Sequence, residues 1–410
     1  MKDELNCAKP LIMHIDLNSC FATIEQQSRP LLRNRPVAVL NRRTEYTSVV
    51  TASYEAKKLG VNVGMKFRDA KLICPGIVGL ESDPPKYRYV YRKLMSILED
   101  YSAHIRMKSV DEGVIDFSQS TRLYQRADLL EVGREIKQRL RAEVGSYMRC
   151  NVGIGPSRFL AKTAANLNKP DGLTVIDHTN LRQVYSKLQL EDLTGIARGY
   201  SKRLRQAGIL TPLDFLNASC EVLEEIVFKS ICGRRWHQRL RGWEVDDMDY
   251  ELKTVGRQFV LDGAGLGYDD ILRRLHGLSE DVAIKLRSQQ VQAYGVRIYA
   301  KTHHVGTWRS YARLPRPFND EKTIFSAVKQ LSKEMPLPCY EVGVTCYSLT
   351  SEEDYQLSIF LEEDKKTTAI TNAIDNINKF WGDHTVHSAD TLGINGRMKR
   401  KIPFGGTRYL

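Results

Sequence analysis

The sequence lacks any apolar run that approaches the ~18–20 residues needed for a helix to cross a bilayer. This excludes a membrane-spanning protein. The N-terminal segment carries acids among its first charges and only a short apolar run, which is not typical of a signal peptide. Cysteine is also sparse: eight residues are scattered along the chain, with no CxxC and no paired-histidine spacing of the kind that accompanies zinc-binding cysteines. This spacing argues against a zinc site and predicts the reduced thiols of a cytoplasmic protein.

Acidic residues are in deficit. The chain has 49 Asp and Glu against 61 Lys and Arg, a net charge of +12. That imbalance favours a polyanionic partner but does not say which one. Its 410 residues are too many for one compact core and predict about two to four domains.

The order of the expected elements predicts an α+β fold. The first 178 residues alternate β-rich runs with helical stretches, short helices follow, and a β-helix-β pattern begins at Thr254. Ser53 is placed to cap a helix that Gly60 ends. The principal expected strands are 11–16, 36–40, 47–52, two within 105–117, 149–155 and 254–261, and the principal expected helices are 18–27, 54–59, 86–100, 280–289, 322–334 and 367–381.

Three acids occupy positions where a carboxylate is costly. Asp16 ends an apolar strand, and Asp111 and Glu112 stand between Val110 and an apolar pair. A carboxylate at a buried strand end must be paired, protonated or metal-bound. Adjacent strand residues face opposite sides, so Asp111 and Glu112 can share a ligand only at a bend, which the flanking Ser109 makes plausible. Three convergent acids suit Mg²⁺, and two such ions would serve an in-line phosphoryl transfer.

A plainer alternative is that these acids form surface ion pairs with the nearby Arg106, Lys108 or Lys66. The pattern of the acids alone does not decide between this alternative and the metal site.

Four segments resemble motifs of the Y-family DNA polymerases, the DinB/UmuC group, in the family's order and spacing. They are HIDLNSCFATIE (14–25), VVTASYEAKKLGV (49–61), SVDEGVID (109–116) and VGIGPSRFLAKTAANLNKPDG (152–172). Similarity continues through 193–209 and 254–261 and so spans most of the chain. The resemblance implies a template-directed translesion polymerase that lacks proofreading.

The resemblance implies a right hand with a ferredoxin-like palm, small fingers, a helical thumb with a helix-hairpin-helix, and a β-α-β little finger. The expected boundaries are palm 1–19 and 86–177, fingers 20–85, thumb 178–246, little finger 254–352, and a clamp-binding segment with a basic tail at 353–410.

By resemblance, Asp16, Asp111 and Glu112 are the catalytic ligands of two Mg²⁺ ions, joined by the backbone carbonyl of Leu17. Phe21 matches the steric gate, whose ring occupies the space that a ribose 2′-OH needs. For Phe21 the alternative is ordinary core packing, because Phe21 and Ile24 are helically spaced.

Other matched positions concern the incoming dNTP. Tyr54 and Lys57 share a helix face and match the residues that hold its β- and γ-phosphates, with Thr51 just before them. Lys169 matches the palm lysine that faces the same phosphates.

Three positions depart from the common family pattern. Asn18 replaces an acid that is not a ligand, and the UmuC branch also has Asn there. Lys57 replaces an arginine, which keeps the charge but loses bidentate geometry. Ala197 replaces the second glycine of the thumb hairpin, where a Cβ is expected to perturb a turn that faces a DNA phosphate.

The remaining expectations concern macromolecular partners. Gln356, Leu357, Ile359 and Phe360 resemble the sliding-clamp peptide, with an edge strand as the alternative. A UmuD-like subunit is a further candidate partner, and the choice between the polymerase IV and polymerase V branches stays open. The residues expected to grip DNA phosphates are Arg198, Lys202, Arg203, Arg205, Arg297, Lys301 and Arg309.

Two other functions compete with an active polymerase. One is an ImuB-like accessory protein that binds DNA and the clamp without chemistry, but such chains lack catalytic carboxylates that are present here. The other is a different palm-fold enzyme such as a nucleotide cyclase, which leaves the thumb and the clamp-like peptide unexplained.

Overall fold

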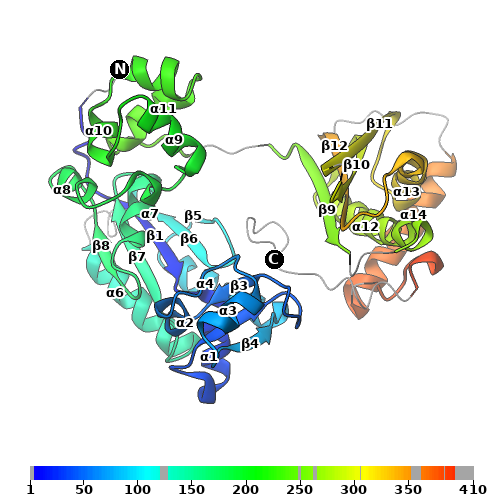
Figure 1. The fold of residues 1–410 in the computed structure, drawn as a ribbon, viewed down its shortest axis with the longest axis horizontal. Coiled ribbons are helices and arrows are strands. Elements are labelled where there is room, and N and C mark those ends of the chain that lie inside the picture. Colours follow the sequence, from blue (N-terminus) through cyan, green and yellow to red (C-terminus); the bar gives the residue numbers. More distant parts are fainter. Residues whose placement is uncertain are drawn as a thin grey trace. The chain divides into compact units, whose positions relative to one another are not determined.

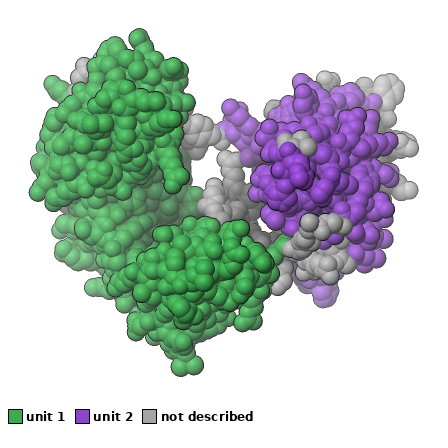
Figure 2. Space-filling model, in the orientation of Figure 1, with its two compact units in different colours: residues 1–248, 401–410 green, residues 249–400 purple. Residues whose placement is uncertain are grey.

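The computed structural model describes residues 4–120, 128–247, 251–261, 266–304, 306–351, 362–382 and 384–392. It divides into two compact units, residues 1–248 together with 401–410, and residues 249–400 (Figure 2). The clamp-like peptide 356–360 and the basic tail lie outside the described residues. In the part of the chain that the structure describes, no helix is both long and apolar enough to span a membrane.

The first unit is built on a five-stranded sheet (Figure 1). Its order is β5-β6-β1-β7-β8; β7 and β8 run parallel, and every other neighbouring pair is antiparallel. The strands are β1 (Ile12–Leu17), β5 (Ile105–Met107), β6 (Glu112–Asp116), β7 (Cys150–Gly155) and β8 (Leu173–Val175).

Alternation along β1 assigns its two faces. Met13, Ile15 and Leu17 belong to the core that also contains side chains of α4 (Pro84–Glu99) and α6 (Leu129–Arg139). His14 and Asp16 therefore point to the opposite face, which carries α7 (Arg158–Asn166).

Helix α7 lies unusually close to the sheet. A Cβ added at Gly153 on β7 would stand 2.1 Å from the carbonyl oxygen of Ala161 and 2.2 Å from the amide nitrogen of Ala165. Only glycine allows this approach, which brings α7 side chains over the row of residues that contains Asp16.

A smaller sheet, ordered β3-β2-β4, contacts α1 and α2, and α3 shares its hydrophobic core. Ser53 Oγ accepts a hydrogen bond from Ala56 N, and Gly60 has a φ of +95°, so the predicted cap and helix end are confirmed. The elements are α1 (Cys20–Ser28), β2 (Val37–Leu40), β3 (Val49–Ala52), α2 (Tyr54–Lys58), α3 (Phe67–Ile73) and β4 (Val78–Glu81).

The short helices after residue 177 enclose an aromatic core in which Trp236 contacts Phe159, Phe215 and Phe228. Gly195 has a φ of +102°, a conformation that favours glycine. Ala197 has φ −103° and ψ 179°, extended backbone in which a Cβ causes no strain. The helices are α8 (Leu181–Tyr185), α9 (Arg198–Gln206), α10 (Pro212–Asn217) and α11 (Cys232–Leu240).

The second unit is an antiparallel sheet, β11-β10-β12-β9, with α12 and α13 packed on one face. Helix α12 begins well before the predicted residue 280. The sequence placed the start too late because buried polar side chains such as Arg274 and His276 interrupt the apolar pattern of the helix. The elements are β9 (Thr254–Val260), α12 (Tyr268–Ser288), β10 (Val291–Thr302), β11 (Gly306–Phe318), α13 (Glu321–Leu331), β12 (Glu341–Ser351) and α14 (Glu362–Trp381).

Candidate active site

The sheet register brings Asp16 and Glu112 together. Asp16 on β1 is paired with Glu112 on β6 and with Asn151 on β7. Directly opposed residues of antiparallel strands project to the same face, so both carboxylates stand on the α7 side of the sheet. Two stretches of chain separated by about a hundred residues thus meet at one row, as the sequence predicts.

Asp111 precedes β6 in a bend that spans residues 109–111, which confirms the bend that the sequence requires. Its backbone oxygen accepts a hydrogen bond from Leu17 N at 2.9 Å. Ser109 Oγ donates to Asp111 Oδ1 at 2.5 Å. This contact fixes the carboxylate beside the other two, and sequence reasoning assigned no role to Ser109 beyond the bend.

Two lysines neutralise the outer acids. Lys169 Nζ lies 2.5 Å from Asp16 Oδ2, and Lys162 Nζ on α7 lies 2.6 Å from Glu112 Oε2. Arg106, one of the three alternative partners, has its guanidinium 3.6 Å from Asp247. Sequence reasoning missed Lys162, although its place on the helix after β7 was a usable signal.

Burial shifts the pKa of two of the three acids upward. It raises the pKa of Asp16 and of Asp111, and the neighbouring carboxylates raise each further. Burial also acts to raise the pKa of Glu112, but the hydrogen bond and charge of Lys162 outweigh it and leave that pKa lowered. A bound cation would relieve the repulsion among Asp16, Asp111 and Glu112.

His14 lies beneath Glu112. Its ring is 2% exposed, and Nε2 is 3.6 Å from Glu112 Oε2. Burial lowers the pKa of His14 to about 3, so the imidazole is neutral and adds no charge to the site at pH 7. Its buried ring therefore lies beside Glu112 as a neutral group.

The predicted phosphate-binding side chains come from α2 and the strand before it. Lys57 Nζ lies 2.8 Å from Ser19 Oγ and 5.0 Å from the centroid of the Tyr54 ring. Burial and then the charge of Asp16 raise the pKa of Tyr54 to about 12, so its hydroxyl stays protonated and can donate. Thr51 is half-buried on β3.

Phe21 is 4% exposed and stacks on Tyr87, with centroids 4.3 Å apart and an interplanar angle of 11°. Tyr87 in turn donates to the fully buried Glu25 at 2.9 Å. Glu25 also contacts Lys86 at 2.9 Å and Arg29 at 2.5 Å. The predicted gate residue therefore rests on a buried charged network.

Replacing Glu25 by alanine is expected to destabilise the chain by about 1–3 kcal/mol, because the buried Tyr87 hydroxyl loses its acceptor. Urea denaturation measures this loss. Glu45→Ala is the control, since Glu45 forms an exposed pair with Lys71 at 3.0 Å that is worth at most about 1 kcal/mol. Equal stability losses in the two variants would contradict this view of Glu25.

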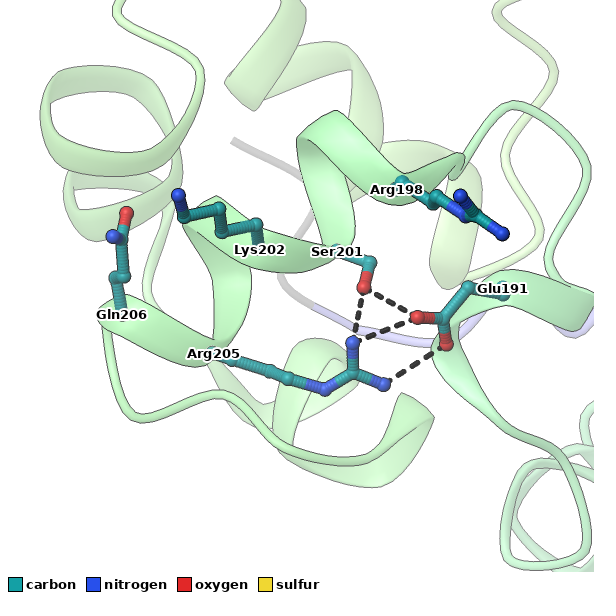
Figure 3. Close-up of a pocket in the computed structure, with 6 residues that line it drawn as sticks. All are labelled: Glu191, Arg198, Ser201, Lys202, Arg205 and Gln206. Atoms are coloured by element: carbon teal, nitrogen blue, oxygen red, sulfur yellow. Dashed lines mark hydrogen bonds and ion pairs between the residues drawn. The ribbon is translucent and has the colours of Figure 1, made fainter.

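The predicted thumb cations differ in their contacts (Figure 3). Arg205 is held by Glu191 at 2.7 and 3.0 Å, so its charge is already balanced. Arg203 lies over the Tyr200 ring, 5.7 Å from its centroid. Within the described ranges, Arg198 and Lys202 form no ion pair, and both are exposed beside the same small hollow.

The second unit presents cations on the sheet face away from α12 and α13. Arg297 is opposite Tyr311, and Arg309 is opposite Tyr299, with both arginines exposed. Lys301 Nζ is 2.9 Å from Glu341, which balances its charge. Sequence reasoning missed Arg313, although Arg309, Tyr311 and Arg313 alternate with period two.

Asp16, Asp111 and Glu112 suit a divalent cation: they supply oxygen donors, interact with one another, and already attract two ammonium groups. Their donor atoms are not all within 4.8 Å of one another, since in the described part of the chain only His276, Glu280 and Glu321 meet that spacing. The lysine contacts offer a reason, because each draws one carboxylate oxygen toward itself.

Comparison with known proteins identifies the family. Residues 15–166 match the impB/mucB/samB family, and residues 253–359 match the C-terminal domain of that family. A DNA polymerase IV of Moorella thermoacetica is 31% identical over 393 residues, covering 93% of this chain and 96% of the relative. DNA polymerase IV 1 of Bacillus subtilis is 29% identical over 395 residues, covering 93% of each chain.

Solved structures agree on the fold. A Y-family DNA polymerase chimera of Dbh and Dpo4 superposes with a TM-score of 0.69 at 22% identity, covering 83% of this chain and 99% of the other. An insertion ternary complex of Dbh DNA polymerase gives 0.57 at 23% identity, with 82% and 98% coverage. The predicted α+β polymerase fold and enzyme class are confirmed. Such polymerases depend on divalent metal ions, and this chain belongs to the Y family of DNA polymerases, the translesion polymerases.

Proposed function

We propose that this chain extends a DNA primer across damaged template by a two-metal mechanism with Mg²⁺, using Asp16, Asp111, Glu112 and the Leu17 carbonyl as ligands. The observation that carries the proposal is the shared row of Asp16 and Glu112 with Asp111 at its end. Two Mg²⁺ ions would supply charge stabilisation for both the attacking and the leaving oxygens.

The cationic side chains then act on the incoming dNTP. Lys169 holds Asp16 in the structure and would exchange that carboxylate for triphosphate oxygens, since an ammonium binds either anion as a point charge. Tyr54 and Lys57 donate to the β- and γ-phosphates from one helix face, and Thr51 lies on the strand that leads into it.

Phe21 would exclude ribonucleotides. Its ring cannot move freely, because it is stacked on Tyr87 and Tyr87 is anchored to Glu25. A fixed ring discriminates by collision, and only a sugar that lacks the 2′-OH fits beside it. Core packing and the gate are compatible here: the packing holds the ring in place.

The proposed domains follow the sequence boundaries: palm 1–19 and 86–177, fingers 20–85, thumb 178–246 and little finger 254–352. Thumb residues Arg198, Lys202 and Arg203 and little-finger residues Arg297 and Arg309 would contact DNA phosphates, which carry no sequence information and therefore suit a lesion-tolerant enzyme. Arg205 and Lys301 would first have to leave Glu191 and Glu341.

The peptide Gln356–Phe360 would bind a sliding clamp through two apolar anchors and a glutamine. Substituting Leu357 and Phe360 together by alanine is expected to reduce clamp-stimulated primer extension at least about tenfold, because both apolar anchors of the peptide are removed. Extension without the clamp should stay unchanged. Ile370→Ala, which removes an exposed apolar side chain on α14, is the control. Loss of clamp-independent activity to the same degree would contradict a clamp-binding role.

Primer extension by the purified chain tests the proposed function. We expect Mg²⁺-dependent synthesis past an abasic site in the template, with no degradation of the primer. Repeating the assay with a UmuD-like protein shows whether such a partner is needed. If the chain binds primer-template DNA but adds no nucleotide under any of these conditions, the enzymatic proposal is overturned in favour of an accessory role.

A further inference from the structure

A second cluster of metal-ligating side chains lies in the second unit, apart from every residue proposed above for polymerisation. His276 and Glu280 are one turn apart on α12, and Glu321 is the first residue of α13. One ligand atom from each lies within 4.8 Å of the other two. Two separate helices therefore present one nitrogen and two carboxylates to a common point.

His276 is held in position but incompletely bonded. It is 4% exposed, and its ring stacks on Phe325 with centroids 3.6 Å apart. Nε2 contacts Glu321, whereas Nδ1 is buried without a hydrogen-bond partner, 3.7 Å from an Asp390 oxygen. That distance is too long for a hydrogen bond. Nε2 is therefore the ring nitrogen that faces the carboxylates of the cluster, and Nδ1 faces Asp390.

The carboxylates of the cluster lack fixed counter-charges. Glu280 is 6% exposed and accepts hydrogen bonds from Ser388 N at 2.9 Å and Thr391 Oγ1 at 3.3 Å, with His384 Nδ1 at 3.8 Å. Neither Glu280 nor Glu321 pairs with a lysine or arginine among the described residues. One carboxylate oxygen of Glu280 and one of Glu321 lie within 4.8 Å of each other, so the two negative charges repel. A cation bound here would remove that repulsion.

We propose that His276 Nε2, Glu280 and Glu321 bind a structural Zn²⁺ ion, with His384 or water as the fourth ligand. Imidazole nitrogen with carboxylate oxygen is a donor set that zinc accepts, and four-coordination is its usual geometry. Asp390 stands where an outer carboxylate would orient the His276 ring through Nδ1. The sequence argued against zinc because it has no cysteine pairs, but this site needs none.

The ion would join three segments of the second unit: α12, α13 and the chain from 384 to 392. The last segment already contacts α12 through Ser388 and Thr391. The role of the ion is therefore structural, and it takes no part in the polymerase reaction.

Isothermal titration of the chelator-stripped full-length protein with Zn²⁺, in excess Mg²⁺ to fill the catalytic site, tests the proposal. We expect one tight equivalent, which Glu280→Gln and Glu321→Gln each weaken at least about tenfold. Glu334→Gln and His304→Gln, exposed residues of the same unit, are the matched controls and should leave the affinity unchanged. Co²⁺ substituted at the site should show a spectrum without thiolate charge transfer.

Circular dichroism checks the fold of each variant, and Glu321→Gln decides if Glu280→Gln does not fold, because the Glu321 side chain is 34% exposed. Absence of a tight Zn²⁺ equivalent, wild-type affinity in folded Glu321→Gln, or a thiolate band with Co²⁺ would each overturn the site. None of these readouts depends on polymerase activity, so failure here leaves the polymerase proposal intact.

Discussion

Asp111→Asn is expected to lower the rate of primer extension by about 10³-fold or more. The substitution keeps the shape of the side chain and its contact with Ser109 but removes one negative charge from the proposed metal site. Metal ions contribute several kcal/mol of charge stabilisation in the transition state, and each ~1.4 kcal/mol is a factor of ten in rate. Single-turnover extension with Mg²⁺ measures the loss, and Glu112→Gln should behave alike.

DNA binding separates this effect from misfolding. Both variants should bind primer-template DNA with nearly wild-type affinity, because the proposed phosphate contacts lie on other elements. Asp69→Asn, which alters an exposed acid beside Arg68, is the control and should extend primers normally. Wild-type extension by either Asp111→Asn or Glu112→Gln would show that these carboxylates do not hold the catalytic ions.

Phe21→Leu is expected to relax discrimination against ribonucleotides at least about tenfold, a change of ~1.4 kcal/mol in the relative barriers. Leucine keeps the position apolar but removes the flat ring that stacks on Tyr87. The ratio of kcat/KM for dNTP and rNTP insertion measures the effect.

Leucine at a core position also costs stability, so the control must lose stability as well. Phe159 is 5% exposed and packs edge-on against Trp236, away from the carboxylates. Phe159→Leu should lower the melting temperature and leave sugar selection unchanged. If Phe21→Leu discriminates between dNTP and rNTP as the wild type does, Phe21 serves only in core packing.

Much of the site could be predicted because its elements have strong local signals. The apolar strand that carries Asp16, the bend at Ser109 and the cap at Ser53 each have a signal within a few residues. The structure forms all three, with the strand ending one residue past Asp16. The family motifs then linked positions that local patterns cannot connect.

What the sequence concealed depends on contacts between distant segments. Lys162 reaches Glu112 only because α7 crosses β1 and β7, and Lys301 is committed to Glu341 only through the pairing of β10 with β12. Helix α12 was predicted too short because a buried histidine and buried acids look like surface residues until a second helix covers them. The zinc-type cluster was hidden for the same reason.

The close seat of α7 over Gly153 makes backbone packing and chemistry inseparable in the first unit. Helix α7 can lie this close only because residue 153 is a glycine. The same helix places Lys162 next to Glu112 and Arg158 next to Asp116. A methyl group at position 153 would lift the helix and carry both positive charges away from their acids. A substitution at this glycine, which lies against the backbone of α7, would then lower activity in the same way as a change to the carboxylates themselves.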